Sequence, residues 1–145
     1  MKRYAWAVLG LGLWVIGAGS AWGQAQRPPP AAELKQNYPN PFNPATTIPF
    51  ALHGDHFSGG RQPVVSLKIY NVLGQLVAIP ILQGSGQALN DLPLTCADAF
   101  AGCTYAAYWD GKVLGTEREA ASGVYLYQLV VDGQRGGTRK MLVMK

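Results

Sequence analysis

Prolines dominate one segment of the chain, Leu34-Lys35-Gln36-Asn37-Tyr38-Pro39-Asn40-Pro41-Phe42-Asn43-Pro44-Ala45-Thr46-Thr47-Ile48. Each of its three prolines removes a backbone donor and pushes the preceding residue towards extended geometry, so the segment cannot be a helix. Because Asn-Pro steps also favour turns, we expect a stiff, kinked lead-in that delivers the chain to a strand. Its two aromatic residues, Tyr38 and Phe42, are expected to pin it there. A plain proline-rich linker is the alternative interpretation.

The residues beyond the lead-in are patterned as strands. The clearest strand is 64–70, in which Val65, Leu67 and Ile69 point to one side and Ser66 and Lys68 to the other. This period of two places one face of the strand on a core and the other in water. The same reasoning predicts strands at 46–52, 76–82, 105–109, 123–131 (with Tyr125, Tyr127, Leu129 and Val131 towards the core) and about 135–144.

Turn residues separate these strands. Gly74 ends a tight turn at 71–75, and the Asp132-Gly133 pair between two β-rich runs is typical of a hairpin. Residues 53–63 are predicted to be a loop, and residues 84–104 an irregular insertion. Short strands, frequent turns and the lack of a helical pattern predict an all-β fold, a two-sheet antiparallel β-sandwich.

The first 23 residues have the composition of a secretory signal peptide. A basic Met1-Lys2-Arg3 precedes an uncharged apolar run at 4–19, and small residues at Ala21 and Gly23 fit a cut before Gln24. The apolar run is shorter than the roughly 20 residues of a spanning helix, which favours a cleaved leader over an uncleaved anchor. Residues 24–33, which include Pro28-Pro29-Pro30, are predicted to be a Pro-rich tether.

Length and charge limit the class of protein. The 145 residues allow one domain, and glycine (18) with proline (10) makes about a fifth of the chain, which is typical of a turn-rich β-protein. The formal net charge is +4. Without Lys2 and Arg3 of the leader, ten cationic residues remain against eight acidic ones, a net of +2. Such scattered charge does not indicate a nucleic-acid partner.

Two cysteines, Cys96 and Cys103, lie within the insertion. In an exported chain we expect them to form a disulfide, with two free thiols as the alternative. His53, Asp55 and His56 carry the side-chain types of a metal site. They stand in a glycine-rich segment without a second cluster to complete a coordination shell, so a solvated loop is favoured.

No constellation of catalytic residues is present. Ser122 stands in Ala-Ser-Gly and not in a nucleophile elbow, and Asp110 precedes Gly111 in what is predicted to be a turn. There is no phosphate-binding loop. The sequence therefore favours a protein that is not an enzyme and has no cofactor, metal or small-molecule substrate.

Three motifs occur in an order that resembles a known family. They are the lead-in Gln36-Asn37-Tyr38-Pro39-Asn40-Pro41-Phe42-Asn43-Pro44, the hairpin Ile69-Tyr70-Asn71-Val72-Leu73-Gly74-Gln75-Leu76-Val77, and Trp109-Asp110-Gly111 with Ala121-Ser122-Gly123-Val124-Tyr125-Leu126-Tyr127. Together they resemble the type A C-terminal sorting domain of the type IX secretion system, which is similar to the Ig-like domain of flagellar hook-capping proteins. The resemblance covers about 34–82 and 105–145. It implies an Ig-like sandwich of about seven strands.

The resemblance also implies a function. In that family the domain is an address: the outer-membrane translocon recognises it, and a sortase-like peptidase commonly removes it while attaching the cargo to surface lipopolysaccharide. Recognition is then expected at the lead-in, at Gly123, Val124 and Tyr125, and at the terminal strand with Lys140, Met141, Leu142, Val143 and Lys145. A terminal edge strand with unpaired backbone groups would suit such a partner. The chain would be exported through the periplasm to the cell surface or the medium.

One departure leaves alternatives open. The family's domain normally follows a large passenger, whereas only ten residues, 24–33, separate the predicted cut from the domain. The chain is then a miniature exported protein, a remnant of a longer gene, or a sandwich that is itself the functional module. In the last case it would be a surface adhesin or an assembly scaffold like the hook-capping domain.

Overall fold

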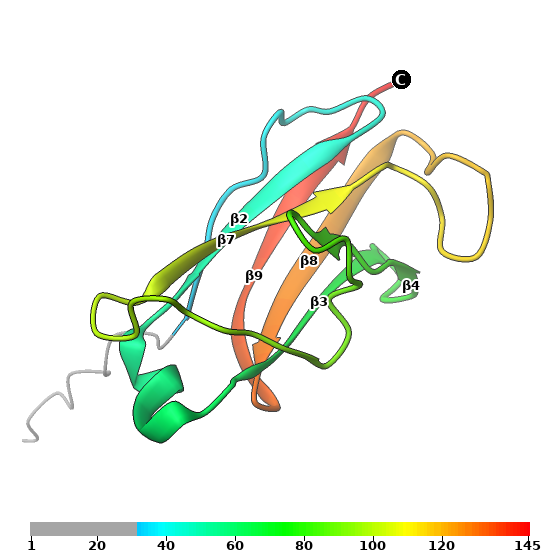
Figure 1. Cartoon of the computed structure of the whole chain (residues 1–145). Coiled ribbons are helices and arrows are strands. Elements are labelled where there is room, and N and C mark those ends of the chain that lie inside the picture. Colours follow the sequence, from blue (N-terminus) through cyan, green and yellow to red (C-terminus); the bar gives the residue numbers. More distant parts are fainter. Residues whose placement is uncertain (1–31) are drawn as a thin grey trace, which may run out of the picture.

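The computed structural model describes residues 32–145 and shows two antiparallel sheets packed face to face (Figure 1). Within these residues the strands are β1 (Ala32–Leu34), β2 (Thr46–Leu52), β3 (Val64–Asn71), β4 (Leu76–Ala78), β5 (Ile81–Leu82), β6 (Leu92–Pro93), β7 (Cys103–Trp109), β8 (Gly123–Val131) and β9 (Gln134–Val143). Two of these strands, β5 and β6, have only two residues each. The predicted all-β, Ig-like antiparallel sandwich of about seven strands is confirmed.

The strand order explains which surfaces are buried. One sheet has the order β1-β2-β7-β5, and the other, which we call the β8 sheet, has the order β4-β3-β8-β9 with β6 also paired to β3. Across β3 and β8, Leu67 lies opposite Leu129 and Ile69 opposite Tyr127, and all four side chains are buried. The alternation predicted from the sequence therefore sets the register of the central strands.

The core fills the space between the two sheets. Its largest fully buried side chains come from both of them and include Ile48, Phe50, Leu67, Ile69, Tyr127, Leu129 and Met141. The predicted insertion also contributes, because it forms β6 and buries Leu89 and Leu94. The amide of Leu67 donates to the carbonyl of Leu89 at 2.9 Å. The insertion is therefore packed on the sandwich and does not loop away from it.

Residues 32 and 33, which the sequence analysis assigned to the tether, form part of the strand β1. Ala32 and Leu34 are both buried in β1, which runs beside β9. A side chain at Gly137, where φ is +149°, would place its Cβ 3.2 Å from the Cβ of Leu34. Glycine thus permits the close approach of the two strands. The guanidinium of Arg139 then donates to the carbonyl of Leu34 at 2.6 Å.

The prediction of one strand at 76–82 was wrong in its continuity. Residues Leu76–Ala78 form β4 on β3, whereas Ile81–Leu82 form β5 on β7, in the other sheet. The chain crosses between the sheets at Ile79 and Pro80. Pro80 has no amide to donate to a ladder, which favours a break between the two strands at this point.

The prediction of a loop at 53–63 was also incomplete, because Gly54–Gly60 is a short 3₁₀ helix (η1). It is anchored by Phe57, which is buried. Gly54 packs on the carbonyl of Ala99, where a Cβ would collide with that oxygen. Short 3₁₀ turns carry little sequence periodicity, so the pattern gave no sign of it.

The predicted leader at 1–23 and most of the predicted tether lie outside the described residues. Within residues 32–145, no helix is long and apolar enough to cross a membrane. Figure 1 places the C-terminus beside the segment that leads into β2, at one end of the sandwich. That end holds the candidate site.

Candidate functional site

The lead-in and the last strand meet edge to edge. The amide of Phe42 donates to the carbonyl of Leu142 at 3.0 Å, and the amide of Met144 donates to the carbonyl of Phe42 at 3.1 Å. The amide of Leu142 donates to Oδ1 of Asn40 at 3.0 Å. The expectation of an open terminal edge is therefore wrong over 142–144: the lead-in already occupies the backbone groups there, as a short parallel addition to β9.

Asn37 fixes the start of the lead-in from inside the protein. Its amide donates to the hydroxyl of Tyr127 at 3.0 Å, and that hydroxyl donates to the carbonyl of Lys35 at 2.8 Å. The Asn37 side chain donates to Oγ1 of Thr46 at 3.0 Å, and the Thr46 hydroxyl donates to the carbonyl of Pro39 at 3.1 Å. A buried polar network thus holds the proline-rich turn in place.

Only one of the two aromatic residues of the lead-in pins it to the core. Phe42 is buried and meets Trp109 edge-on at 5.4 Å between ring centroids; Trp109 in turn meets Tyr125 at 5.9 Å. Tyr38 is 59% exposed, so the expectation that its ring is an anchor was wrong. Its backbone takes that role, because Tyr38 and Thr47 exchange hydrogen bonds of 2.9 Å in both directions.

The strand β8 joins the same group of residues. Gly123 pairs with Val143, Val124 with Leu142, and Tyr125 with Met141. Of these, Tyr125, Met141 and Val143 are buried, whereas Val124 and Leu142 point outwards. At the end of the chain the amide of Lys145 donates to Oγ of Ser122 at 3.1 Å.

We call this assembly the composite edge: residues 37–44, 123–125 and 140–145. It contains all three segments that the resemblance assigned to sorting, and the last strand lies between the lead-in and the start of β8 and pairs with both. The Trp109-Asp110-Gly111 motif packs against the lead-in. Gly111, with φ of +85°, contacts the carbonyl of Pro44, and a Cβ at this position would collide with that oxygen. Sequence reasoning did not identify the side chains that tie the segments together, which are Tyr127, Asn40 and Gln36, whose side-chain amide donates to the carbonyl of Lys140 at 3.1 Å.

Burial sets the ionisation of the tyrosines in this region. Burial raises the pKa of Tyr127 above its ordinary value of 10.0, although the hydrogen bond from Asn37 and the charge of Arg139 act in the opposite direction. Burial also raises the pKa of Tyr125, whose hydroxyl donates to the carbonyl of Ala121 at 2.7 Å. Both phenols are therefore neutral donors at ordinary pH.

The composite edge lies in the apolar half of the protein surface. Of the twelve large hydrophobic side chains that are exposed in the described part of the chain, eleven lie in the half of the sandwich that carries it: Tyr38, Val72, Leu73, Leu76, Ile81, Tyr108, Leu114, Val124, Leu126, Leu142 and Met144. The twelfth, Phe100, lies towards the other end. These side chains are divided between the two sheets: Ile81 and Tyr108 belong to the sheet of β2 and β7, whereas Val124, Leu126 and Leu142 share the outer face of the β8 sheet. Apolar groups that share an exposed face are typical of a surface that contacts a partner.

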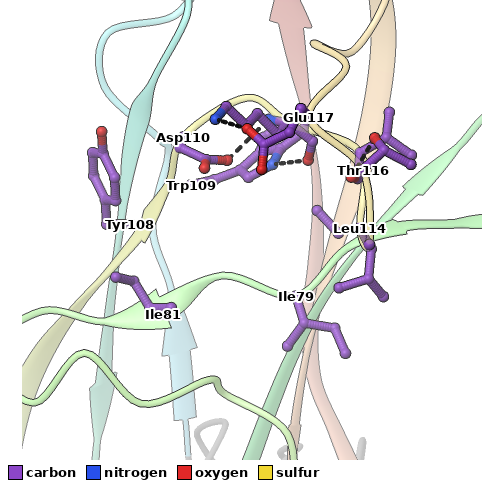
Figure 2. Close-up of a pocket in the computed structure, with 12 residues that line it drawn as sticks. Ile79, Ile81, Tyr108, Trp109, Asp110, Leu114, Thr116 and Glu117 are labelled. Carbon is purple, nitrogen blue, oxygen red and sulfur yellow. Dashed lines mark hydrogen bonds and ion pairs between the residues drawn. The ribbon is translucent and has the colours of Figure 1, made fainter.

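A pocket of about 280 Å³ opens beside Trp109 (Figure 2). Tyr108 and Ile81 lie on one side of it, and Ile79 and Leu114 lie on the other, with Leu114 on the loop that follows β7. Lys112 and Glu117 form an ion pair of 2.6 Å at its rim. The hydrogen bond with Glu117 raises the pKa of Lys112 and lowers that of Glu117. The pocket combines an apolar wall with a charged rim, which suits a protruding side chain of a partner.

The structure places the two cysteines together. Cys96 and Cys103 form a disulfide with their Cα atoms 5.8 Å apart, as expected, and the described residues contain no free cysteine. The closed loop is braced by Asp98, whose carboxylate accepts from the amides of Phe100 and Ala101 at 3.2 and 3.3 Å. It lies at the end of the sandwich away from the composite edge.

The histidine cluster does not assemble into a metal site. His56 Nδ1 lies 3.9 Å from the Asp132 carboxylate, on a different segment, and its amide donates to the carbonyl of His53. Among residues 32–145, no group of three or more His, Cys, Asp or Glu side chains is placed to hold an ion. Asp110 accepts from the amide of Lys112 at 2.9 Å, the turn contact expected of it.

Comparison with known proteins adds little to this geometry. No family model matches the chain, and no curated protein matches it. Among solved structures, the chain is similar to an alkylpurine DNA glycosylase of Pseudomonas fluorescens bound to DNA containing an abasic site analogue, with 15% sequence identity and a TM-score of 0.48. The match covers 79% of this chain and 31% of that chain. At these values the similarity supports no functional assignment.

Proposed function

We propose that this chain is a non-catalytic sorting domain that directs export across the outer membrane by the type IX secretion system, followed by attachment at the cell surface. One observation carries the proposal. The segments whose sequences resemble the sorting-domain motifs, up to about 100 residues apart, form a single composite edge through the pairing of Phe42 with Leu142 and of Gly123 with Val143. A translocon and a sortase-like peptidase are the proposed partners.

The surface of the composite edge supports recognition by a protein. Val124 and Leu142 lie opposite each other on neighbouring strands and point outwards. Met144, two residues after Leu142, is also exposed. Exposed apolar side chains on a rigid sheet lose little conformational entropy when a partner covers them. The lead-in would have to leave β9 before a partner could add a strand there, so we propose that the edge is recognised through its side chains.

Two features support an exported, non-catalytic role. The disulfide is of the kind that persists in oxidising compartments, which agrees with the predicted leader and with passage through the periplasm. The hydroxyl of Ser122 and the carboxylate of Asp110 are both used in structural hydrogen bonds, to Lys145 and Lys112. Neither side chain is paired with a base or an acid that would activate it.

The decisive test is cellular location. The chain, behind its own leader and fused to a reporter, would be expressed in a host with type IX machinery, and the cells fractionated. Removal of 140–145 is a poor variant, because Met141 and Val143 are buried and their loss would damage the core. The double substitution Leu142→Ser with Met144→Ser changes only exposed side chains, with Phe100→Ser at the far end as the matched control.

The expected result is surface or medium location for the parent and for Phe100→Ser, and retention in the periplasm for the double variant with an unchanged melting temperature. A parent protein that is itself retained in the periplasm would overturn the proposal. So would normal location of the double variant.

A surface adhesin or assembly scaffold is the second candidate, and one observation favours it. Phe100 is fully exposed at the tip of the disulfide-closed loop, where its amide donates to the carboxylate of Asp98. A rigid loop with an exposed aromatic tip is the form that binding anchors take. On this function, Phe100→Ser would leave the location unchanged and abolish capture of a surface partner.

A further inference from the structure

The outer face of the β8 sheet has an unusual composition. An antiparallel sheet that faces water normally carries polar side chains on that face. Here the outward positions of β8 are Val124, Leu126, Gln128 and Val130, three of which are apolar. The neighbouring strand places Tyr70 opposite Leu126, and β9 places Leu142 opposite Val124.

The charged residues at the outward strand positions of this face are all positive. Lys68 lies opposite Gln128, Lys140 opposite Leu126, and Arg135 opposite Val130. None of the outward residues of β3, β8 and β9 is acidic. Three carboxylates border this face: Asp91 accepts from the Ser66 hydroxyl of β3 at 3.0 Å, Asp132 accepts from the amide of Val64 at 2.9 Å, and Glu119 forms an ion pair of 3.4 Å with Lys145.

A projecting turn continues the apolar surface. Val72 and Leu73 are 71% and 79% exposed at the tip of the β3–β4 turn. The turn is rigid, because Oδ1 of Asn71 accepts from the amides of Leu73 and Gln75, both at 3.0 Å. Turn tips ordinarily carry polar residues. Two exposed aliphatic side chains on a turn whose hydrogen bonds hold it in place therefore indicate a surface that contacts an apolar partner.

We propose that this face and turn form a docking surface for an anionic lipid membrane. Charge complementarity selects the occupant: the three cations require a negative partner, and the apolar side chains require one that also buries hydrocarbon. A second copy of the chain is disfavoured, since a two-fold face-to-face contact would oppose cations with cations. A fluid bilayer interface accommodates the projecting Val72 and Leu73 without a preformed pocket, which a folded acidic protein would have to supply.

This surface shares Val124, Lys140 and Leu142 with the composite edge, but its binding to a membrane does not require the proposed sorting role. The test uses the chain expressed behind its own leader and purified after leader removal, with vesicles of phosphatidylcholine alone or with 30% phosphatidylglycerol, at low and high salt. Each surface cation contributes about fivefold to binding of an anionic membrane. The variant Lys68→Glu with Arg135→Glu lies outside the composite edge. Arg61→Glu with Arg118→Glu is its charge-matched control, because both of these residues are exposed and lie outside β3, β8 and β9.

The expected result is sedimentation with the anionic vesicles only, weakened by salt, and at least about 25-fold weaker for Lys68→Glu with Arg135→Glu than for the control pair. Val72→Ser with Leu73→Ser should also weaken binding, with an unchanged melting temperature. Equal binding to neutral vesicles, no vesicle binding at all, or equal loss in the control pair would each overturn the proposal. Capture of an acidic protein without vesicle binding would overturn it in favour of a protein partner. Because location is read in cells and binding in vesicles, failure of one proposal leaves the other standing.

Discussion

The side-chain oxygen of Asn40 accepts a hydrogen bond from the amide of Leu142 at 3.0 Å, across a sequence separation of 102 residues. The contact closes an edge that would otherwise offer backbone groups to any passing strand. It also joins the lead-in and the last strand into one unit, so that a partner that binds one segment also contacts the other.

Substitution of Asn40 tests this closure. Asn40→Ala removes the acceptor of the Leu142 amide and should lower the free energy of unfolding by about 1 kcal/mol, the net value of one hydrogen bond. Amide hydrogen exchange at Leu142 and Met144 should accelerate, because the lead-in separates from β9 more often. Asn43→Ala, in the same segment with an exposed side chain, is the control. Equal acceleration in both variants would contradict the closing role of Asn40.

Loss of the Tyr127 hydroxyl should destabilise the start of the lead-in. Tyr127→Phe leaves the amide of Asn37 and the carbonyl of Lys35 without their buried partner, which costs about 1–3 kcal/mol in urea unfolding. Tyr38→Phe is the control, since Tyr38 is exposed. If both variants lost the same stability, the buried network would not be what holds the segment.

Alkaline pH should act through the same group. The pKa of Tyr127 is raised in the folded protein, so the unfolded chain loses its phenolic proton first, near pH 10. The contribution to stability is therefore complete below pH 10 and is lost as the pH rises through the raised pKa. We expect the parent to lose stability steadily above pH 10, and Tyr127→Phe to lose less over the same range. Parallel curves for the two proteins would contradict this.

The central strands and turns could be predicted from the sequence, because alternation and Asp-Gly pairs are local. Val65, Leu67 and Ile69 are buried as the pattern requires, and Asp132-Gly133 connects β8 to β9. The break at Pro80 was not predicted, since the residues on both sides of it are equally apolar. Which of two sheets a short strand joins depends on distant partners.

The segments of the candidate site could be named from the sequence, but their assembly into one surface could not be predicted from it. The resemblance identified the lead-in, the start of β8 and the end of β9. Their meeting depends on Asn40, Asn37 and Tyr127, whose bonds span most of the chain, and no local pattern marks a polar side chain that reaches so far. The same limit explains Tyr38: a proline-rich segment fixes its backbone, but which aromatic ring turns inwards is decided by the space beside Trp109.

The contact of Gly111 with Pro44 gives a sharper test of the packing behind the composite edge. Gly111→Ala introduces a Cβ at positive φ that collides with the Pro44 carbonyl, so backbone must move, and we expect a loss of roughly 3 kcal/mol in unfolding free energy. Gly115→Ala shares the positive φ, at +74°, but meets nothing within 4 Å. It should cost only the backbone strain, about 1–2 kcal/mol. Equal losses of unfolding free energy in the two variants would show that the lead-in moves away from residue 111 at no cost, which would contradict tight packing there.

The disulfide should stabilise the far end without affecting the composite edge. In the chain-entropy model, closing so short a loop contributes about 2–3 kcal/mol, which Cys96→Ser with Cys103→Ser should remove in urea unfolding. Hydrogen exchange should rise within 96–103, where only the hydrogen bonds accepted by Asp98 then hold the loop, and should stay unchanged in β8 and β9. Reductant should lower the stability of the parent to that of the variant and leave the variant itself unaffected. A variant that also frays at Leu142 would contradict this independence, because it would couple the loop to the edge through the whole length of β7.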